Sequence, residues 1–220
     1  MKSKSAYILL IFLLFLSCKG EDDSYVYPPV KLEFINAQTN SSGYVSYLQT
    51  DKDTIYDITN DRTSSKLDAN TLERVVCYYT VLSKASSSQH GTADLYSILK
   101  AVSPTPGKLA TGYQMKTDAV GIQSVWLSGQ YINMTLQVKL QSKTHLFNFI
   151  ENSISLSQGT PTINLTLYHD KSDDVEAYTK IAYLSVPLQK YIQQYPSGFN
   201  VSISINTYSG VKTYTFNYVP

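Results

Sequence analysis

Tyr131–Gln141 reads YINMTLQVKLQ, and apolar and polar side chains alternate along its whole length. The apolar positions are Ile132, Met134, Leu136, Val138 and Leu140, and the polar positions are Asn133, Thr135, Gln137, Lys139 and Gln141. Successive side chains of a β-strand point to opposite faces, so a period of two predicts a strand with one dry and one wet face. Such strands are typical of antiparallel sheets that share a core.

The same alternation continues on both sides of this stretch. It predicts further strands at Ile122–Leu127, Thr144–Ile150, Pro161–Tyr168, Lys180–Val186, Phe199–Thr207 and Val211–Val219. Ser128–Gly129 and Ser209–Gly210 supply turn signals for two hairpins. About seven short alternating strands predict an immunoglobulin-like β-sandwich, here without an internal disulfide.

One segment of this half has helical rather than β spacing. Leu188, Tyr191, Ile192 and Tyr195 recur at helical intervals after Pro187, a residue that suits a first turn. We therefore expect a short helix that plugs one end of the sandwich.

The first half of the chain is also β-like. Its expected strands are Val30–Ala37, Gly43–Thr50, Thr54–Thr59, Leu72–Leu82 and Ala93–Val102. Five strands of this length suit a small OB-like barrel over residues 30–102. Two prolines and a glycine within 103–111 indicate a linker, which places the sandwich at 112–220. The predicted fold class is therefore all-β, a five-stranded OB-like barrel followed by a seven-stranded immunoglobulin-like β-sandwich.

The N-terminus resembles a secretion signal that ends on a cysteine. Lys2 and Lys4 precede the apolar run Tyr7–Leu16, which is much shorter than the about 20 residues of a membrane-spanning helix. The small residue Ser17 before Cys18 predicts a signal peptide at 1–17 that is removed, and lipidation of Cys18. Acyl chains on Cys18 would anchor the protein to a membrane.

Residues 18–29 are expected to form the lipidated tether. They begin with a short charged segment that contains Lys19, Glu21, Asp22 and Asp23. This segment resembles the acidic tag that directs lipoproteins of the Bacteroidetes to the cell surface. The expected location is the outer membrane, with the protein facing the cell exterior.

Charge and cysteine content limit the possible partners. The formal charge is +1, and removal of residues 1–17 leaves 16 basic against 17 acidic residues. This balance argues against nucleic acid as a partner, because such proteins carry basic patches. Apart from Cys18, the only cysteine is Cys77, which lies in the apolar stretch Val75–Tyr79 and is expected to be buried.

The sequence contains no recognisable catalytic or metal-binding motif. The three histidines lack ligand spacing, and the acidic cluster after His169 lacks the pattern of a calcium loop, so a solvated loop is expected there. No nucleophile elbow and no phosphate-binding glycine loop occur. We expect no cofactor, no metal and no enzymatic activity.

Aromatic residues offer the one candidate binding surface. Tyr44, Tyr47 and Tyr56 lie in the barrel half, where an OB-like face can bind sugars or single strands. The alternative is that these tyrosines pack half-buried between strands, as tyrosine commonly does. Trp126 lies within an apolar strand and is expected in the core.

Several short motifs occur in an order that resembles the NigD-like lipoproteins of the Bacteroidetes. They are Ser17–Cys18 with Glu21–Asp23, the strand Val75–Leu82, Tyr96–Leu99, and Ile122–Trp126 followed by Ser128–Asn133. The resemblance implies an N-terminal OB-like domain, a C-terminal β-sandwich and a suggested link to bacteriocin immunity. It implies no catalytic residues.

Three functions remain open from the sequence. The first is a non-catalytic, lipid-anchored envelope protein that binds a glycan, peptide or protein at the outer-membrane surface. The second is a bacteriocin-related immunity or neutralising lipoprotein, and the third is a surface glycan-processing enzyme.

Overall fold

The computed structural model describes residues 29–157 and 159–220. The signal peptide, Cys18, and the charged segment with Lys19, Glu21, Asp22 and Asp23 lie outside the described residues. Within the described part, no helix is both long enough and apolar enough to cross a membrane.

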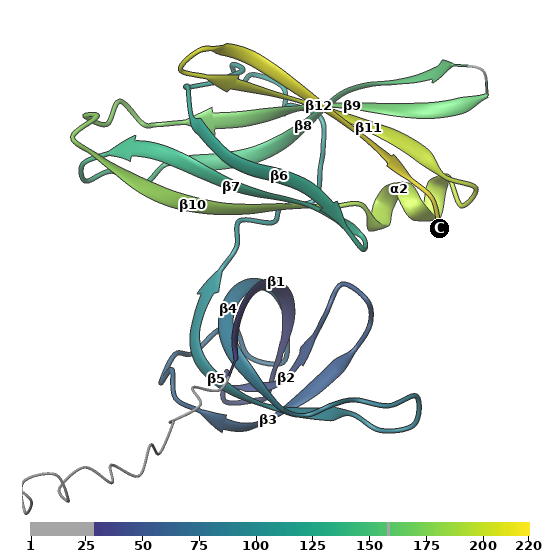
Figure 1. Cartoon of the computed structure of the whole chain (residues 1–220). Coiled ribbons are helices and arrows are strands. Elements are labelled where there is room, and N and C mark those ends of the chain that lie inside the picture. The colour runs from purple at the N-terminus through teal and green to yellow at the C-terminus, as the bar shows by residue number, and fades with distance from the viewer. Residues whose placement is uncertain (1–28, 158) are drawn as a thin grey trace, which may run out of the picture.

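The first domain is a closed five-stranded barrel, as predicted (Figure 1). Its strands are β1 (Val30–Thr39), β2 (Val45–Gln49), β3 (Ile55–Asp61), β4 (Leu72–Ser83) and β5 (Gly91–Lys100). They close in the order β1-β2-β3-β5-β4, and β3 pairs with β5 in parallel. Closure removes most free strand edges, which are otherwise sites of unwanted pairing.

The barrel encloses its own apolar core. Ile35, Leu48, Tyr79 and Leu95 are fully buried there, together with Cys77. Burial raises the pKa of the Cys77 thiol to about 12, and the nearby Glu33 carboxylate adds to the effect. Cys77 is therefore an inert, buried side chain, which confirms the expectation from sequence.

The second domain contains the seven predicted strands. They are β6 (Gly121–Ser128), β7 (Tyr131–Leu140), β8 (Leu146–Ser157), β9 (Thr160–Asp170), β10 (Tyr178–Pro187), β11 (Phe199–Thr207) and β12 (Gly210–Tyr218). One sheet has the order β10-β7-β6 and the other β12-β11-β9-β8. The dry face of β7 is confirmed, because Ile132, Met134 and Leu136 are completely buried between the sheets.

The larger sheet is mixed, whereas a typical immunoglobulin-like sheet is purely antiparallel. β11 pairs with β9 in parallel, whereas β8–β9 and β11–β12 are antiparallel. Side-chain alternation is the same for parallel and antiparallel strands buried on one face, so the sequence pattern does not distinguish them. The short helix α2 (Gln189–Gln194) follows β10, and Tyr191 inserts from it into the sandwich core.

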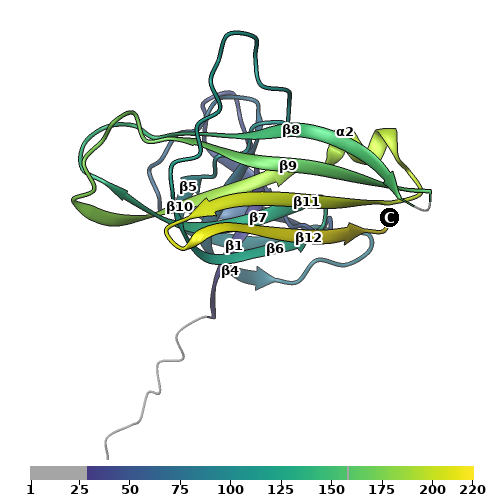
Figure 2. The same ribbon diagram turned by 90° about the horizontal axis from the view of Figure 1, so that it is seen from above.

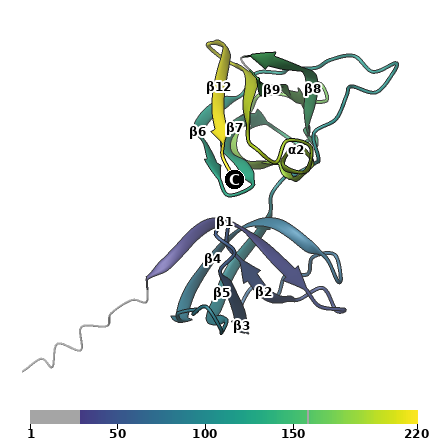
Figure 3. The same ribbon diagram turned by 90° about the vertical axis from the view of Figure 1, so that its right-hand side faces the viewer.

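The segment after β5 runs across the sandwich as a strap. It makes single β-bridges at Val102–Leu184, Gly107–Ile150, Thr117–His169 and Val120–Thr207. The predicted linker 103–111 lies within it. Figure 3 shows this segment leaving the barrel on one side and joining the sandwich.

The sandwich lies over the barrel with its three-stranded sheet as the nearer layer (Figures 1 and 2). Phe34 and Val76 of the barrel are buried with Ala101, and Tyr183 of β10 packs against them. The face of β10-β7-β6 that points away from the sandwich core is therefore partly covered by the barrel.

Candidate binding groove between the two domains

One end of the domain interface is organised by a buried arginine. Arg74 of β4 is 5% exposed, and its guanidinium binds both carboxylate oxygens of Asp51, at 2.6 and 3.0 Å. A bidentate pair of this kind combines charge with planar geometry. Asp51 lies in the turn between β2 and β3, so the pair ties two parts of the barrel together.

The remaining donors of Arg74 reach the sandwich and β1. Nη2 donates to the Asn133 amide oxygen at 3.0 Å, Nε to the Ser185 hydroxyl at 3.2 Å, and Nη1 to the Asn36 amide oxygen at 3.3 Å. All five N–H donors of a guanidinium are thereby used. The ring of Tyr131 lies 3.9 Å from the guanidinium carbon and covers it from one side.

Asn133 illustrates what the sequence pattern could not show. Its position on the polar face of β7 predicted contact with water, but it is 1% exposed. The barrel covers this part of the face, and the Asn133 amide oxygen accepts hydrogen bonds from Arg74 and from the Ser185 hydroxyl at 2.6 Å. The expectation of a wet position is therefore wrong for Asn133.

The β6–β7 turn completes the closed end. Gly129 has φ +52° and lies so close to Asp51 that a Cβ atom there would overlap the Asp51 carbonyl oxygen. Glycine is required because it provides both this backbone conformation and the close approach. The hairpin predicted at Ser128–Gly129 thus also forms a contact between the domains.

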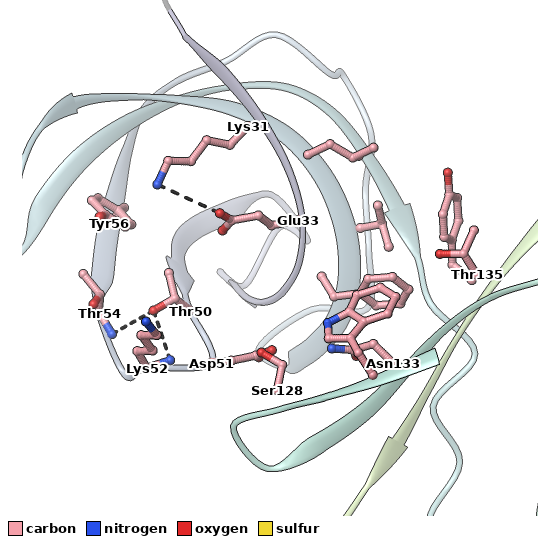
Figure 4. A pocket seen from close by; sticks show the side chains of 15 residues that line it. Lys31, Glu33, Thr50, Asp51, Lys52, Thr54, Tyr56, Ser128, Asn133 and Thr135 are labelled. Carbon is pink, nitrogen blue, oxygen red and sulfur yellow. Dashed lines mark hydrogen bonds and ion pairs between the residues drawn. The ribbon is translucent and has the colours of Figure 1, made fainter. Parts of the chain in front are cut away.

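Next to this closed end the interface opens into a groove of about 540 Å³. Figure 4 shows that Lys31 and Glu33 project into it from β1, with Tyr56, Thr54 and Thr50 on the opposite wall. Its volume is in the range of about 300–1,000 Å³ that is usual for ligand pockets.

The barrel side of the groove is polar and charged. Glu33 accepts a hydrogen bond from the Tyr79 hydroxyl at 2.7 Å, and the Lys31 ammonium lies 4.0 Å from the Glu33 carboxylate. Burial raises the pKa of Tyr79, and its hydrogen bond to Glu33 raises it further. Tyr79 therefore stays a neutral donor that orients Glu33 at the mouth of the barrel.

The sandwich side of the groove is aromatic. Trp126 of β6 is 36% exposed, and its ring meets Phe34 edge to face at 5.4 Å. Tyr183 contacts the same Phe34 ring at 5.7 Å. The expectation that Trp126 lies in the core is wrong, because its side of β6 points toward the barrel and away from the sandwich interior.

The three tyrosines singled out from the sequence do not form one face. Tyr56 pairs with Leu48 and packs against the barrel core, whereas Tyr47 pairs with Asp57 on the other face of the same strands. Tyr44 precedes β2, where the Lys66 ammonium lies 5.0 Å from its ring centre. Of these three tyrosines, only Tyr56 lines the groove.

A second buried polar cluster lies in the sandwich, where His145 directly precedes β8 and His169 lies near the end of β9. The His145 Nδ1 is 2.9 Å from the His169 Nε2, and the His169 Nδ1 is 2.8 Å from the Asp118 carbonyl oxygen. The His145 Nε2 lies 3.6 Å from Asp174. Burial lowers the pKa of His169, which favours its neutral form.

Asp174 corrects the prediction of a solvated acidic loop. It is 6% exposed and accepts backbone N–H groups of Gln141 at 2.7 Å and Ser142 at 3.1 Å. Burial alone would raise its pKa, but these hydrogen bonds lower the pKa of Asp174 to about 2. Asp173 and Glu176 of the same loop are exposed, as expected. No metal-binding group of three acidic, histidine or cysteine side chains occurs in the described ranges.

Arg74, Asp51, Asn133 and Ser185 were not identified from the sequence. The only local signal is Arg74 itself, a charged residue that follows Glu73 and directly precedes the apolar run of β4. Its partners come from β1, the β2–β3 turn, β7 and β10, so their spacing along the chain does not reveal them.

Comparison with known proteins shows which family and which solved structures the chain is similar to. The model for the NigD-like C-terminal beta sandwich domain matches residues 102–218. The crystal structure of a NigD-like immunity protein from Bacteroides caccae matches with a TM-score of 0.70 and 34% identity, over 89% of this chain and 100% of that chain. No curated protein sequence matches.

Two more distant structures share the fold. A protein of unknown function from Bacteroides vulgatus matches with a TM-score of 0.69 and 17% identity, over 87% of this chain and 92% of that chain. A protein described as toxin-related, from Parabacteroides distasonis, matches with a TM-score of 0.65 and 16% identity, over 87% of this chain and 94% of that chain.

Proposed function

The chain belongs to the NigD-like family, and we propose on that basis that it is a non-catalytic immunity protein of the cell envelope. The observation that carries the proposal is the similarity along both domains to a protein described as a NigD-like immunity protein, at 34% identity. In this role the protein binds a toxic peptide and keeps it from its target.

The interdomain groove is the proposed binding site. It combines an exposed tryptophan with charged side chains, a composition typical of binding sites. Its carboxylates support binding rather than acid–base chemistry. Asp51 is held in a bidentate pair by Arg74, and Glu33 accepts the Tyr79 hydroxyl at 2.7 Å.

We further propose that acyl chains on Cys18 anchor the protein to the outer membrane and that the following acidic segment directs it to the outer surface. Protease treatment of intact cells tests this location. Loss of the C-terminal domain without lysis is expected. Full protection from the protease would instead favour a periplasmic protein and periplasmic partners.

Deletion of the gene tests the function itself. A deletion strain is expected to become more sensitive to the bacteriocin of a neighbouring producer, and the wild-type gene should restore resistance. Unchanged sensitivity to bacteriocins, together with release of sugars from host or dietary polysaccharides by the purified protein, would replace the proposal with a glycan-processing enzyme.

A further inference from the structure

The first half of β1 has a strand partner on one side only. β4 pairs with β1 along Val30–Gln38, but β2 joins the other edge only along Asn36–Thr39. In the part of the chain that the structure describes, no strand pairs with the second edge of residues 30–35. At about 3.3 Å per residue, this leaves about 20 Å of open strand edge.

This open edge lies in the interdomain groove. The consecutive residues Lys31, Leu32, Glu33 and Phe34 all line it. Since successive side chains of a strand point to opposite faces, a groove lined by four neighbours in sequence must run along the edge of the strand. Backbone N–H and C=O groups of β1 are therefore available to a molecule in the groove.

The two sides of this edge differ in chemistry. Leu32 and Phe34 point to the sandwich side, where Phe34 meets Trp126. Lys31 and Glu33 point to the barrel side, where both approach Tyr79. A strand placed along β1 would therefore meet apolar side chains on one face and charged side chains on the other.

We propose that an extended peptide of another protein binds along residues 30–35 as an added β-strand. Its backbone pairs with β1, and its side chains alternate between apolar residues against Trp126 and Phe34 and charged residues opposite Lys31 and Glu33. This inference rests on the proposed function in one respect only, namely that the peptide belongs to the toxic partner.

The walls of the groove favour a single peptide over a second copy of the protein. Trp126 and Ser128 stand on the sandwich side of the edge, and Thr50 and Lys52 stand on the side of the β2–β3 turn. Another folded barrel would have to bring its own neighbouring strands into this walled space. A linear peptide brings none.

Peptides selected from a phage-displayed library of random linear peptides on the full mature protein provide the probe. Hydrogen exchange is then measured with and without a selected peptide. We expect alternate amides within residues 30–35 to exchange at least about tenfold more slowly when the peptide is bound, as hydrogen-bonded amides do. Slow exchange of these amides before any peptide is added would show that the edge is already covered and would overturn the proposal.

N-methylation of the peptide, one residue at a time, tests the ladder directly. Removal of N–H groups that face β1 should weaken binding by about tenfold or more, and removal of the alternate ones should have little effect. Trp126→Ala should weaken binding by about tenfold, with Tyr113→Ala as the control because Tyr113 is 71% exposed and does not line the groove.

Three further results would also overturn the inference. The first is that no selected peptide binds at the groove. The second is that N-methylation weakens binding without alternation along the peptide. The third is that Trp126→Ala leaves binding of the peptide unchanged. If a peptide binds by this ladder but gene deletion leaves bacteriocin sensitivity unchanged, strand addition stands and only the immunity proposal fails. If deletion causes sensitivity but methylation shows no alternation, only strand addition fails.

Discussion

The interface between barrel and sandwich has two ends that differ in construction. At the closed end, Arg74 is 5% exposed and uses all its donors on Asp51 and polar side chains of both domains. At the open end, Trp126 is 36% exposed beside the unpaired edge of β1. The difference indicates a division of roles, in which the closed end holds the domains in place and the open end is available to a ligand.

Replacement of Arg74 at the closed end should cause the largest loss in the free energy of unfolding. Arg74→Ala leaves Asp51 buried without its counter-ion, which should lower the free energy of unfolding by about 3–5 kcal/mol. Chemical denaturation measures the change. Arg62→Ala is the control, because Arg62 makes a single contact of 3.2 Å with Asp94 and its side chain is 55% exposed, so about 1 kcal/mol or less is expected. Equal losses in both variants would contradict a special role for Arg74.

A methyl group at the β6–β7 turn should disturb the same end less strongly. Gly129→Ala places a Cβ against the Asp51 carbonyl, whereas Gly112→Ala has a similar positive φ of +88° and nothing within 4 Å. The difference in unfolding free energy between the two variants isolates the contact between domains. We expect Gly129→Ala to cost about 1–3 kcal/mol more, as overpacking does. The contact would be unimportant if thermal denaturation showed the two variants to be equally stable.

Shortening the Trp126 side chain at the open end should change the free energy of unfolding little. Trp126→Ala removes one edge-to-face contact with Phe34, so a loss of about 1 kcal/mol in unfolding free energy is expected. A loss as large as that of Arg74→Ala, measured by the same denaturation, would mean that Trp126 holds the domains together. The distinction between a structural end and a binding end would then be wrong.

Mild acid should destabilise the sandwich through the buried His169. Burial lowers the pKa of His169 below its ordinary value of 6.5, so the unfolded chain binds a proton more readily than the folded one. This contribution is present above pH 6.5 and is lost as the pH falls toward the folded-state pKa. The melting temperature should therefore decrease over this range, and less so in His169→Gln. His90→Gln is the control, because the His90 side chain is 50% exposed. The melting temperature of this variant should decrease as that of the wild type does. An Arg74→Ala variant that lost this pH dependence would contradict the assignment to His169.

The sequence predicted the elements well because each strand has its own periodic pattern. The alternation in β7 indicated the buried row Ile132, Met134 and Leu136, and the structure confirms it. The same pattern was misleading for Asn133 and Trp126. Alternation separates the two faces of a strand, but it does not tell whether water or another domain covers the polar face.

The candidate site was largely invisible in the sequence for the same reason. Arg74 and Asn133 lie 59 positions apart, and their hydrogen bond depends on how two domains meet. Likewise, His145 and His169 come within 2.9 Å only because β8 and β9 form a hairpin that brings their ends together. The open edge of β1 depends on where β2 begins to pair, which a strand prediction for each segment does not specify.

Trp126 itself offers the most direct test of the open end, because it is the only tryptophan of the chain. Its fluorescence is titrated with a selected linear peptide, and calorimetry measures binding of the same peptide in parallel. A bound peptide that covers the indole should shift the emission to shorter wavelength with the same saturation as the calorimetric signal. Calorimetric binding without any change in Trp126 emission would show that the ligand site lies elsewhere.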